Sequence, residues 1–296
     1  MSSQVLRVGR FSTGTVDIHP QHAHRGRAPL YWWILTSRRW VTARPINVYV
    51  VEHSEGLVVF DTGQDRASVT DSEYFPVGPT GLIYRRLARF HVAEDETVTS
   101  GLARLGYRPS DVTTAVISHL HQDHIGGIAE LAHADLLVSA DEWRSHLRPL
   151  AGPRGYLRAH IDVPGWFWRQ LEFPRLSGTA LQPFTHGHDL FGDGSLVILP
   201  TPGHTPGSIS MYVRRPRAVP LFLVGDLTYD IHAFERGVHG GVGSHRRLRQ
   251  TREKVLALKA SHPGMRILAA HDPHAARLLD PASDVQLGGE SWTTSH

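Results

Sequence analysis

The amino-acid sequence predicts an α/β protein in which two β-sheets pack face to face with helices on both outer sides, a four-layer αβ/βα sandwich. Short apolar segments of strand length recur in both halves of the chain, and segments with helical spacing lie between them. The chain has 296 residues, of which 41% are apolar and 20% charged, which is ordinary for a globular enzyme with a large core. We therefore expect a single domain over residues 1–296.

The first half of the chain contains the clearest strand pair. Ile46–Phe60 reads INVYVVEHSEGLVVF, two β-branched segments joined by a polar Ser-Glu-Gly turn. Glu96–Leu105 has helical spacing and is followed by an apolar strand at Thr114–Ser118. A helix is expected to begin after Gly127, and a further strand is expected at Asp135–Ser139. This alternation predicts strands that are connected through helices.

The second half repeats the pattern after a long irregular region. Strand-like segments occur at Ser195–Leu199, Ser208–Val213 and Val219–Val224, separated by turn signals. A long helix is expected at Arg246–Ala260 and a last strand at Arg266–Ala270. Because strands and helices occur in both halves, we expect two sheets.

Two stretches have no regular period and are predicted as loop and helix insertions over or beside an active site, residues 64–95 and 141–191. The aromatic clusters Tyr31–Trp33 and Trp166–Trp168 lie in irregular segments and are candidates for lining an apolar pocket, although core packing is the commoner role of such clusters. The extended stretch Tyr74–Arg89 is a weak indication of a homodimer.

The composition excludes several classes of function. There is no cysteine, so disulfides and thiolate metal sites are impossible, and any metal must be held by nitrogen and oxygen ligands. The net charge is only +3 and the arginines are scattered, which argues against nucleic acid as a partner. The N-terminus has no signal-peptide core and no apolar run spans a membrane, so we expect a cytoplasmic protein without membrane partners.

Four metal-competent side chains lie within six residues, directly after the apolar strand Thr114–Ser118. His119 and His121 are two apart, so in an extended chain they point to the same side and can bind one ion. The turn that follows can direct Asp123 and His124 to a second ion. The alternative is a polar surface turn that contains histidines by chance, but this cluster directly follows a strand that is expected to be buried.

Two other histidine pairs lack such partners. His22 and His24 have no acidic residue after them, and His186 and His188 precede Asp189 in a glycine-containing loop. Among 21 histidines chance pairs are expected, so both pairs are interpreted as ordinary surface residues.

Further candidate ligands follow strands downstream. His204 lies in the turn Pro202–Gly207 between two strands, where small residues let the backbone approach a metal. Asp226 ends one strand and has two oxygens that can bridge two ions, and His271 follows the last strand. Five histidines and two aspartates thus supply seven ligands for two ions: His119, His121, Asp123, His124, His204, Asp226 and His271.

In order and approximate spacing, these seven residues resemble the HxHxDH...H...D...H signature of the metallo-β-lactamase superfamily, over roughly Ile46 to Asp272. The resemblance implies the four-layer fold of that superfamily and two divalent metal ions, zinc being the first expectation, with iron, cobalt and manganese left open. Asp61 resembles the aspartate that orients a metal-bound histidine. The implied assignment is His119, His121 and His204 on the first ion, Asp123, His124 and His271 on the second, and Asp226 as the bridge.

Two further features narrow the reaction. Tyr229, three positions after Asp226, looks like the tyrosine that acyl-homoserine lactonases place over their metals. The run Gly106–Pro109 ahead of the histidine motif also looks like those quorum-quenching lactonases. The alternative for Tyr229 is an ordinary loop tyrosine, because one residue at a short offset is modest evidence.

The resemblance implies a hydrolase that opens the ring of N-acyl-homoserine lactones or related lactones. Two ions sharing a water would lower its pKa towards about 7 and supply the hydroxide that attacks the carbonyl. Tyr229 and one ion would stabilise the charge on the carbonyl oxygen, and Asp123 would pass a proton to the leaving ring oxygen. Asp123, Tyr229 and Asp226 are therefore the candidate catalytic residues.

Several alternatives remain open from sequence alone. A thioesterase of the glyoxalase II type would use a similar ligand set, as would a phosphodiesterase or an organophosphate hydrolase. A non-enzymatic alternative is a catalytically dead module that keeps the fold, although all seven candidate ligands are intact. The exact lactone and the preferred acyl chain length depend on loop shapes that the sequence does not determine.

Overall fold

The computed structural model describes residues 4–216, 218–279 and 284–286. Its larger sheet has eight strands, and β4 (Ala88–His91) pairs with β1 outside the main order. From edge to edge the other strands are β13 (Asp284–Gln286), β1 (Val5–Ile18), β2 (Val41–His53), β3 (Gly56–Phe60), β5 (Val112–Val116), β6 (Asp135–Ser139) and β7 (Trp168–Leu171).

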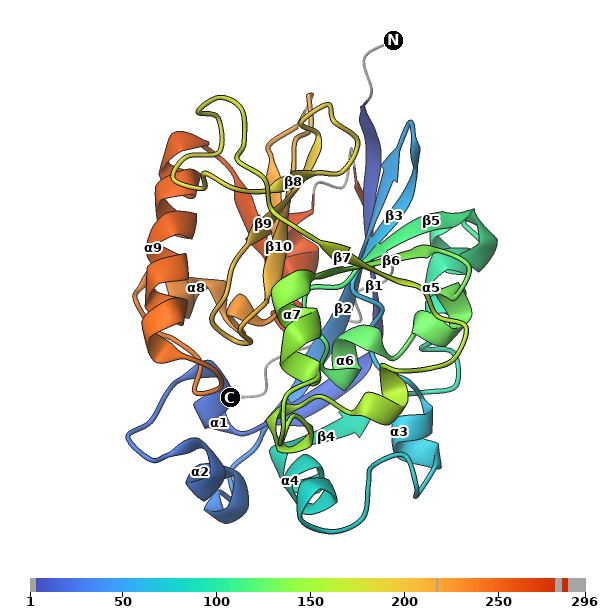
Figure 1. Cartoon of the computed structure of the whole chain (residues 1–296), viewed down its shortest axis with the longest axis vertical. Coiled ribbons are helices and arrows are strands. Elements are labelled where there is room, and N and C mark those ends of the chain that lie inside the picture. Colours follow the sequence, from blue (N-terminus) through green and yellow to red (C-terminus); the bar gives the residue numbers. More distant parts are fainter. Residues whose placement is uncertain (1–3, 217, 280–283, 287–296) are drawn as a thin grey trace.

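The smaller sheet has five strands and packs against the larger one (Figure 1). In spatial order its strands are β12 (Arg266–Leu268), β11 (Leu221–Leu223), β10 (Ile209–Val213), β9 (Leu196–Pro200) and β8 (His188–Asp189). Within it β11 and β12 are parallel and the other pairs are antiparallel.

Successive residues of the central strands are buried on opposite faces, which explains why these strands read as continuous apolar runs. In β2, Tyr49 packs in the core between the sheets, while Val50 packs in the core on the outer face of the larger sheet. In β9, Ile198 belongs to the inter-sheet core and Val197 to the core under the outer helices. Three apolar cores therefore separate four layers.

Helices cover both outer faces of the sandwich. Over the smaller sheet lie α8 (Ile231–Glu235) and α9 (His245–Ser261), and α9 buries Leu248, Val255 and Leu258 against that sheet. On the side of the larger sheet, α5 (Val98–Leu105) buries Leu102 and Leu105. Nearby are α6 (Gln122–Ile125) and α7 (Ala140–His146).

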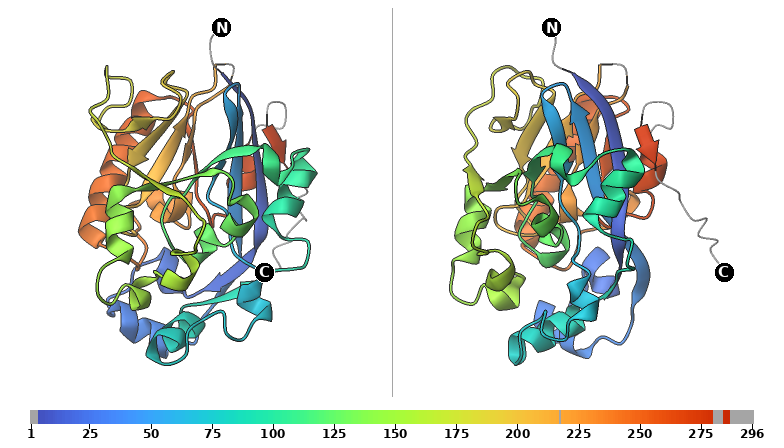
Figure 2. Two further views of the ribbon diagram at one scale, coloured as in Figure 1. Left: turned by 45° about the vertical axis from the view of Figure 1, so that its right-hand side comes forward. Right: turned by 90° about the vertical axis from the view of Figure 1, so that its right-hand side faces the viewer.

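The remaining helices gather at one end of the sandwich in all three views, below the strand ends (Figures 1 and 2). They are α1 (Pro20–Ala23), α2 (Leu30–Thr36), α3 (Ala67–Thr70) and α4 (Pro79–Leu87). Helices α2 and α4 are in contact although they are far apart in the sequence. This arrangement places residues 20–36 and part of the region 64–95 at the same end of the molecule, away from the N-terminus.

The four-layer α/β prediction is confirmed, and the predicted strands and the long helix are present with small shifts. The helix expected after Gly127 is a short 3₁₀ turn (Ile128–Leu131), and the long strand β1 was not predicted. The short strands β4, β7, β8 and β13 were not predicted either. The strand β1 carries Gly9 and Gly14 and polar residues, which obscured its period. The division into one domain with insertions at 64–95 and 141–191 stays a prediction.

Among the described residues, no helix is both long enough and apolar enough to cross a lipid bilayer.

Candidate metal centre

The histidine motif lies in the loop that leaves β5 and enters α6. Backbone hydrogen bonds tie this loop to the one that follows β3: Thr62 N donates to His124 O, and Gly126 N donates to Gly63 O. A β-carbon on Gly126 would lie 2.1 Å from the backbone nitrogen of Asp65, so only glycine permits this approach. The two loops therefore hold each other, and the motif is rigid before any ligand binds.

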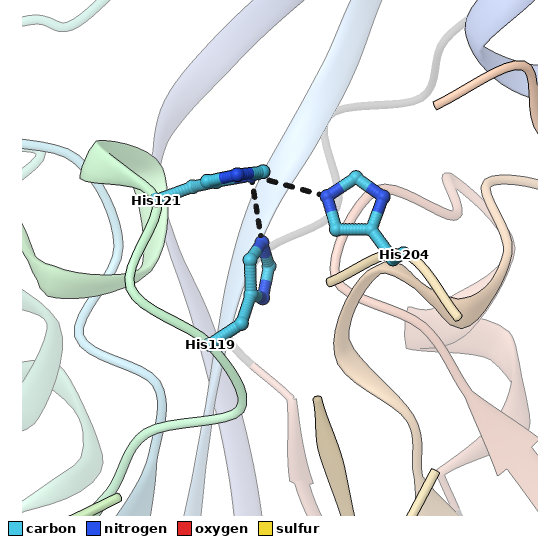
Figure 3. Close-up of side chains that lie close together, drawn as sticks. All are labelled: His119, His121 and His204. Carbon is cyan, nitrogen blue, oxygen red and sulfur yellow. Dashed lines mark hydrogen bonds between the residues drawn. The ribbon is translucent and has the colours of Figure 1, made fainter. Parts of the chain in front are cut away.

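Three imidazoles converge on one point (Figure 3). His119 Nε2 lies 3.0 Å from His121 Nδ1, and His204 Nε2 lies 3.1 Å from the same atom. His121 Nε2 lies 3.1 Å from Arg154 O, and since a carbonyl only accepts, Nε2 carries the proton and Nδ1 keeps its lone pair. Gly155 has φ +106° and passes so close to this ring that a β-carbon would lie 2.2 Å from His121 Nε2.

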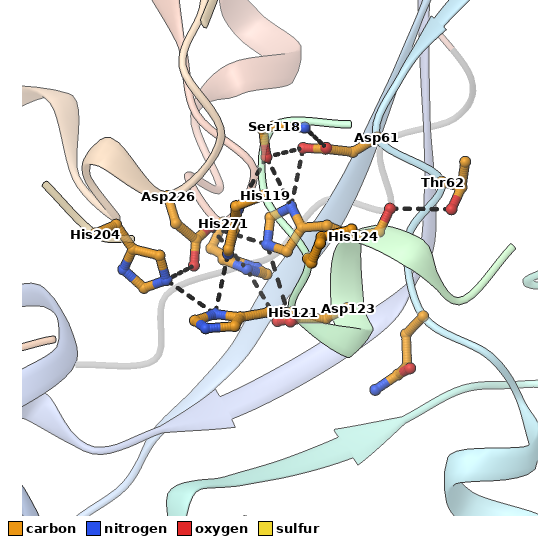
Figure 4. Close-up of polar contacts among 12 residues, drawn as sticks. Asp61, Thr62, Ser118, His119, His121, Asp123, His124, His204, Asp226 and His271 are labelled. Carbon is orange, nitrogen blue, oxygen red and sulfur yellow. Dashed lines mark hydrogen bonds and ion pairs between the residues drawn. The ribbon is translucent and has the colours of Figure 1, made fainter. Parts of the chain in front are cut away.

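A second group lies beside the first, around Asp226 (Figure 4). His271 Nε2 is 3.3 Å from Asp123 Oδ2 and 3.3 Å from Asp226 Oδ1. His124 Nε2 is also 3.3 Å from Asp226 Oδ1, and His204 Nε2 is 3.5 Å from Asp226 Oδ2. Asp226 thus faces histidines of both groups, as a bridging carboxylate must.

Asp61 holds one of these histidines from behind. Its Oδ2 accepts a hydrogen bond from His124 Nδ1 at 2.9 Å, and its Oδ1 accepts one from Ser118 N at 2.7 Å. The Ser118 hydroxyl donates to Asp61 Oδ2 at 2.9 Å. Asp61 has φ +61°, a left-handed conformation that aspartate tolerates better than most residues. The geometry matches the orienting role that the sequence predicts for Asp61.

Burial keeps two of the first group's imidazoles neutral. It lowers the pKa of His204 to about 3 and the pKa of His119 well below its ordinary value, with further lowering at His119 from neighbouring His124. A neutral imidazole has a lone pair available for a cation, so these rings are in the protonation state that metal binding requires.

Carboxylates dominate the electrostatics of the second group. Burial alone would lower the pKa of His271, but Asp226 and Asp123 outweigh it and raise the value to about 10. Burial likewise opposes ionisation of Asp226, yet His271 and His124 lower its pKa well below the usual range. No lysine or arginine within the described part of the chain forms an ion pair with these carboxylates. The charges of these carboxylates are therefore offset by His271 and His124, and bound cations would take over that role.

The residues fit two divalent ions. In His121, His124 and His271 one ring nitrogen is directed at a carbonyl or carboxylate oxygen, which leaves the other nitrogen facing the cluster. Two cluster atoms, His124 Nε2 and Asp226 Oδ1, are buried and make no hydrogen bond. Nitrogen and oxygen donors in this arrangement suit zinc and similar ions. All seven predicted ligands are brought together, while their roles as ligands stay a prediction.

Tyr229 reaches the same cluster. Its hydroxyl donates a hydrogen bond to Asp226 Oδ2 at 2.7 Å, and its ring stacks on His271 with centroids 5.4 Å apart. Burial, followed by the charge of Asp226, raises the pKa of Tyr229 well above its ordinary value, so the hydroxyl keeps its proton. The expectation that Tyr229 lies at the metal site therefore agrees with its position, which is not that of an ordinary loop tyrosine.

A cavity opens directly onto the cluster and Tyr229. Its walls are largely apolar and come from β1, α2, α4 and β4, with Ile18, Ile34, Ile83 and Phe90 among the lining residues. Neither aromatic cluster considered from the sequence is among the lining residues. Trp33 packs in the interior, and Phe167 is 81% exposed.

Two residues at the site were not identified from the sequence. Glu142, fully buried at the start of α7, accepts hydrogen bonds from Leu120 N, Thr205 Oγ1 and Gly207 N at 3.1, 2.7 and 3.0 Å. It thereby joins the two loops that carry the first three histidines. A charged residue just after a strand was the only available signal, and it is a common pattern at helix starts.

The second is His22, which was interpreted as a surface residue. The structure contradicts this interpretation, because His22 is 4% exposed and lines the cavity, whereas His24 is exposed as expected. His186 is exposed and His188 half-buried, and neither belongs to a metal-competent group within the described residues. The sequence shows no period around His22 from which its burial follows.

The two-sheet sandwich with a buried histidine and aspartate cluster at its strand ends defines a class of metal-binding α/β proteins. The sequence pattern of the Metallo-beta-lactamase superfamily matches residues 41–271, so the chain belongs to that superfamily. The family expected from the histidine motif is thus confirmed.

Particular relatives are also similar to this chain. An N-acyl homoserine lactonase AttM from Azorhizobium caulinodans is 31% identical over 237 residues, which cover 78% of this chain and 83% of the relative. A solved N-acyl homoserine lactone hydrolase with the product N-hexanoyl-L-homoserine at its catalytic metal centre superposes with a TM-score of 0.73 at 19% identity, covering 94% of this chain and 97% of that one. The dizinc quorum-quenching lactonase AidC superposes with a TM-score of 0.60 at 17% identity, covering 92% and 91%.

Proposed function

We propose that this protein is a metal-dependent hydrolase that opens the lactone ring of N-acyl homoserine lactones or closely related lactones. The observation that carries the proposal is the junction of the seven-residue cluster and Tyr229 with an apolar cavity. A lactone ring at the cluster would place an acyl chain along Ile18, Ile34 and Ile83. The relatedness to an N-acyl homoserine lactonase over most of both chains supports the same substrate class.

Two divalent ions, with zinc as the proposed metal, would be held by the three converging histidines and by the group around Asp123, with Asp226 between them. When bound, such ions lower the pKa of a water and polarise a carbonyl oxygen. Three of the histidines are held in a fixed orientation, because the ring nitrogen that faces away from the cluster contacts an oxygen. The three contacts are His121 Nε2 with Arg154 O, His124 Nδ1 with Asp61 Oδ2 and His271 Nδ1 with Pro45 O.

The side chains of the cluster have separate tasks. When a lactone binds, the Tyr229 hydroxyl would turn its one proton from Asp226 Oδ2 to the lactone carbonyl oxygen, where negative charge develops. Asp123, whose carboxylate is the most exposed of the cluster's three aspartates, takes up the proton that the attacking water loses and delivers it to the leaving ring oxygen. The apolar walls exclude competing water from the acyl side of the reacting ester.

The cavity is a poor fit for the alternative substrates. A glutathione thioester or a phosphodiester carries negative charges that basic side chains normally bind. Among the described residues that line this cavity, Arg154 is the only arginine and there is no lysine. A lactone with an apolar tail is therefore favoured.

The test is hydrolysis of N-acyl homoserine lactones by the metal-loaded protein, beside a thioester and a phosphodiester, for wild type and Tyr229→Phe. We expect lactones to be the best substrates and Tyr229→Phe to lower kcat by about 10²-fold or more while both ions are retained. Turnover of a thioester or phosphodiester with untouched lactones would contradict the proposal. An unaffected kcat in Tyr229→Phe would contradict the role of the hydroxyl.

A further inference from the structure

His22 is a polar residue of the cavity wall that the proposed reaction leaves without a role. It lies in α1, is 4% exposed, and lines the cavity that also reaches Tyr229 and Asp226. Buried polar side chains nearly always have a hydrogen-bond partner. The contacts of this imidazole therefore indicate what it can bind.

The ring has a fixed orientation. Its Nδ1 lies 3.2 Å from His19 O, and Trp33 meets it edge-on with ring centroids 4.9 Å apart. Gly241 N donates to Gln21 O at 2.8 Å, which ties α1 to the segment before α9. Backbone hydrogen bonds hold α1, and contacts with His19 and Trp33 hold the His22 ring, before any substrate enters.

The contact with His19 O determines which nitrogen is free. A carbonyl oxygen only accepts, so Nδ1 carries the proton and Nε2 of the neutral ring is an acceptor. Burial, the largest influence, lowers the pKa of His22 to about 4, so the ring is neutral at pH 7. No donor among the described residues reaches Nε2. The cavity wall therefore presents a hydrogen-bond acceptor.

The other described polar side chains of this wall outside the cluster offer no acceptor that a substrate can reach. The Tyr84 hydroxyl donates to Gly152 O at 3.0 Å. Gln122 Oε1 makes no hydrogen bond among the described residues, but this atom is buried beneath the surface of the wall. Arg154 offers donors only. A substrate donor entering the cavity beside the cluster thus meets the acceptor of His22.

His22 lies one aromatic ring away from the cluster. The Tyr229 ring contacts His22 at a centroid distance of 6.0 Å and His271 at 5.4 Å. In an N-acyl homoserine lactone the amide nitrogen is bonded to the ring carbon next to the ester carbonyl. When that carbonyl is at the cluster and Tyr229, its amide N–H is therefore in the neighbourhood of His22.

We propose that His22 is a specificity-determining residue whose Nε2 accepts a hydrogen bond from the amide N–H of the substrate. This inference rests on the proposed function and deepens it. A site that contains an acceptor discriminates against an analogue without the donor, because the acceptor is then left unpaired. His22 would thus select acylamino lactones over lactones that carry only a hydrocarbon or ester substituent.

The test compares two substrates that differ in one atom: N-octanoyl homoserine lactone and α-octanoyloxy-γ-butyrolactone, in which an ester oxygen replaces the N–H. The readout is the ratio of kcat/KM for ring opening, amide over ester, because intrinsic reactivities cancel when this ratio is compared between variants. We expect the ratio to fall about tenfold in His22→Phe, because one hydrogen bond to a buried partner is lost. The ratio should recover in His22→Gln, because glutamine restores an acceptor.

Tyr84→Phe is the matched control, since it removes a different polar group from the same wall, and its ratio should equal that of wild type. Metal content and thermal midpoint of each variant show that the centre and the fold are retained. An unchanged ratio in His22→Phe, with both lactones opened, would overturn the inference and leave the proposed function intact. A metal-loaded wild type that opens neither lactone would overturn the proposed function and this inference with it.

Discussion

The metal cluster and the apolar cavity share one end of the molecule but are built in different ways. The cluster stands on loops that leave sheet strands, and hydrogen bonds such as His124 Nδ1 to Asp61 Oδ2 lock its side chains. The cavity walls come largely from the short elements α2, α4 and β4. Strand β4 is hydrogen-bonded to β1 at the edge of the sheet, whereas α2 and α4 meet mainly through side-chain packing. The residues proposed for the reaction therefore lie on hydrogen-bonded loops of the sheets, whereas those proposed to select the substrate lie on segments that tolerate change.

The largest effect is expected from Asp226→Asn, which keeps the shape of the bridging side chain but removes its charge. We expect fewer than two ions per chain and a loss of lactone hydrolysis greater than about 10³-fold, beyond the effect of one oxyanion donor. Metal analysis and kcat/KM check this. Asp230→Asn is the matched control, because Asp230 caps α8 through Ala233 N and asparagine also caps helices. If Asp226→Asn kept two ions and full activity, the metal cluster would tolerate change as the cavity walls do, and the contrast between the two would be wrong.

A smaller effect is expected from Glu142→Gln, which tests whether the rigidity of the cluster depends on its supports. The amide would direct its NH₂ group at the Gly207 or Leu120 N–H, replacing an acceptor by a donor. We expect metal affinity to fall about 10–100-fold, the usual effect of losing such a support. Chelator competition measures the affinity.

The control for Glu142→Gln is Asp141→Asn, which alters the exposed neighbour of Glu142 whose carboxylate pairs with Arg144 on the surface. This change should leave metal affinity unaltered. Equal affinities in both variants would mean that the loops of the cluster support themselves without Glu142.

The smallest effect is expected in the cavity. Each methylene buried along an apolar wall contributes about 0.8 kcal/mol, or about fourfold in kcat/KM, until the cavity is full. Ile34→Phe should move this limit to shorter acyl chains without changing the rate for the shortest one. A series of acyl chain lengths measures the limit. Leu35→Phe, at the next and 43% exposed position, is the control. A uniform loss for every chain length would place Ile34 outside the acyl path.

Features that depend on residues close together in the sequence were predicted best. The motif His119–His124 directly follows the apolar segment of β5, so its side chains had to lie at a strand end, and the structure brings them to the downstream candidates His204, Asp226 and His271. Period-two and helical spacing also predicted most strands and α9. Tyr229 was anticipated by its offset from Asp226, and it lies at the cluster.

Residues whose environment depends on distant contacts were missed or misjudged. His22 is buried because Trp33 and the segment near Gly241 cover it, and neither contact is visible as a local pattern. Glu142 matters because it meets Leu120 and Gly207, which are 22 and 65 residues away. For the aromatic clusters, core packing was the favoured interpretation, and the burial of Trp33 agrees with it, whereas Phe167 is exposed.

The family, the sandwich and the set of candidate ligands can be predicted from the sequence, because they depend on residue types at short spacings along strands and loops. The tertiary structure alone decided the shape of the cavity and the surroundings of His22 and Glu142. These features arise where α1, α2 and α4 meet the strand ends, and side-chain packing between segments far apart in the chain leaves no periodic trace in the sequence.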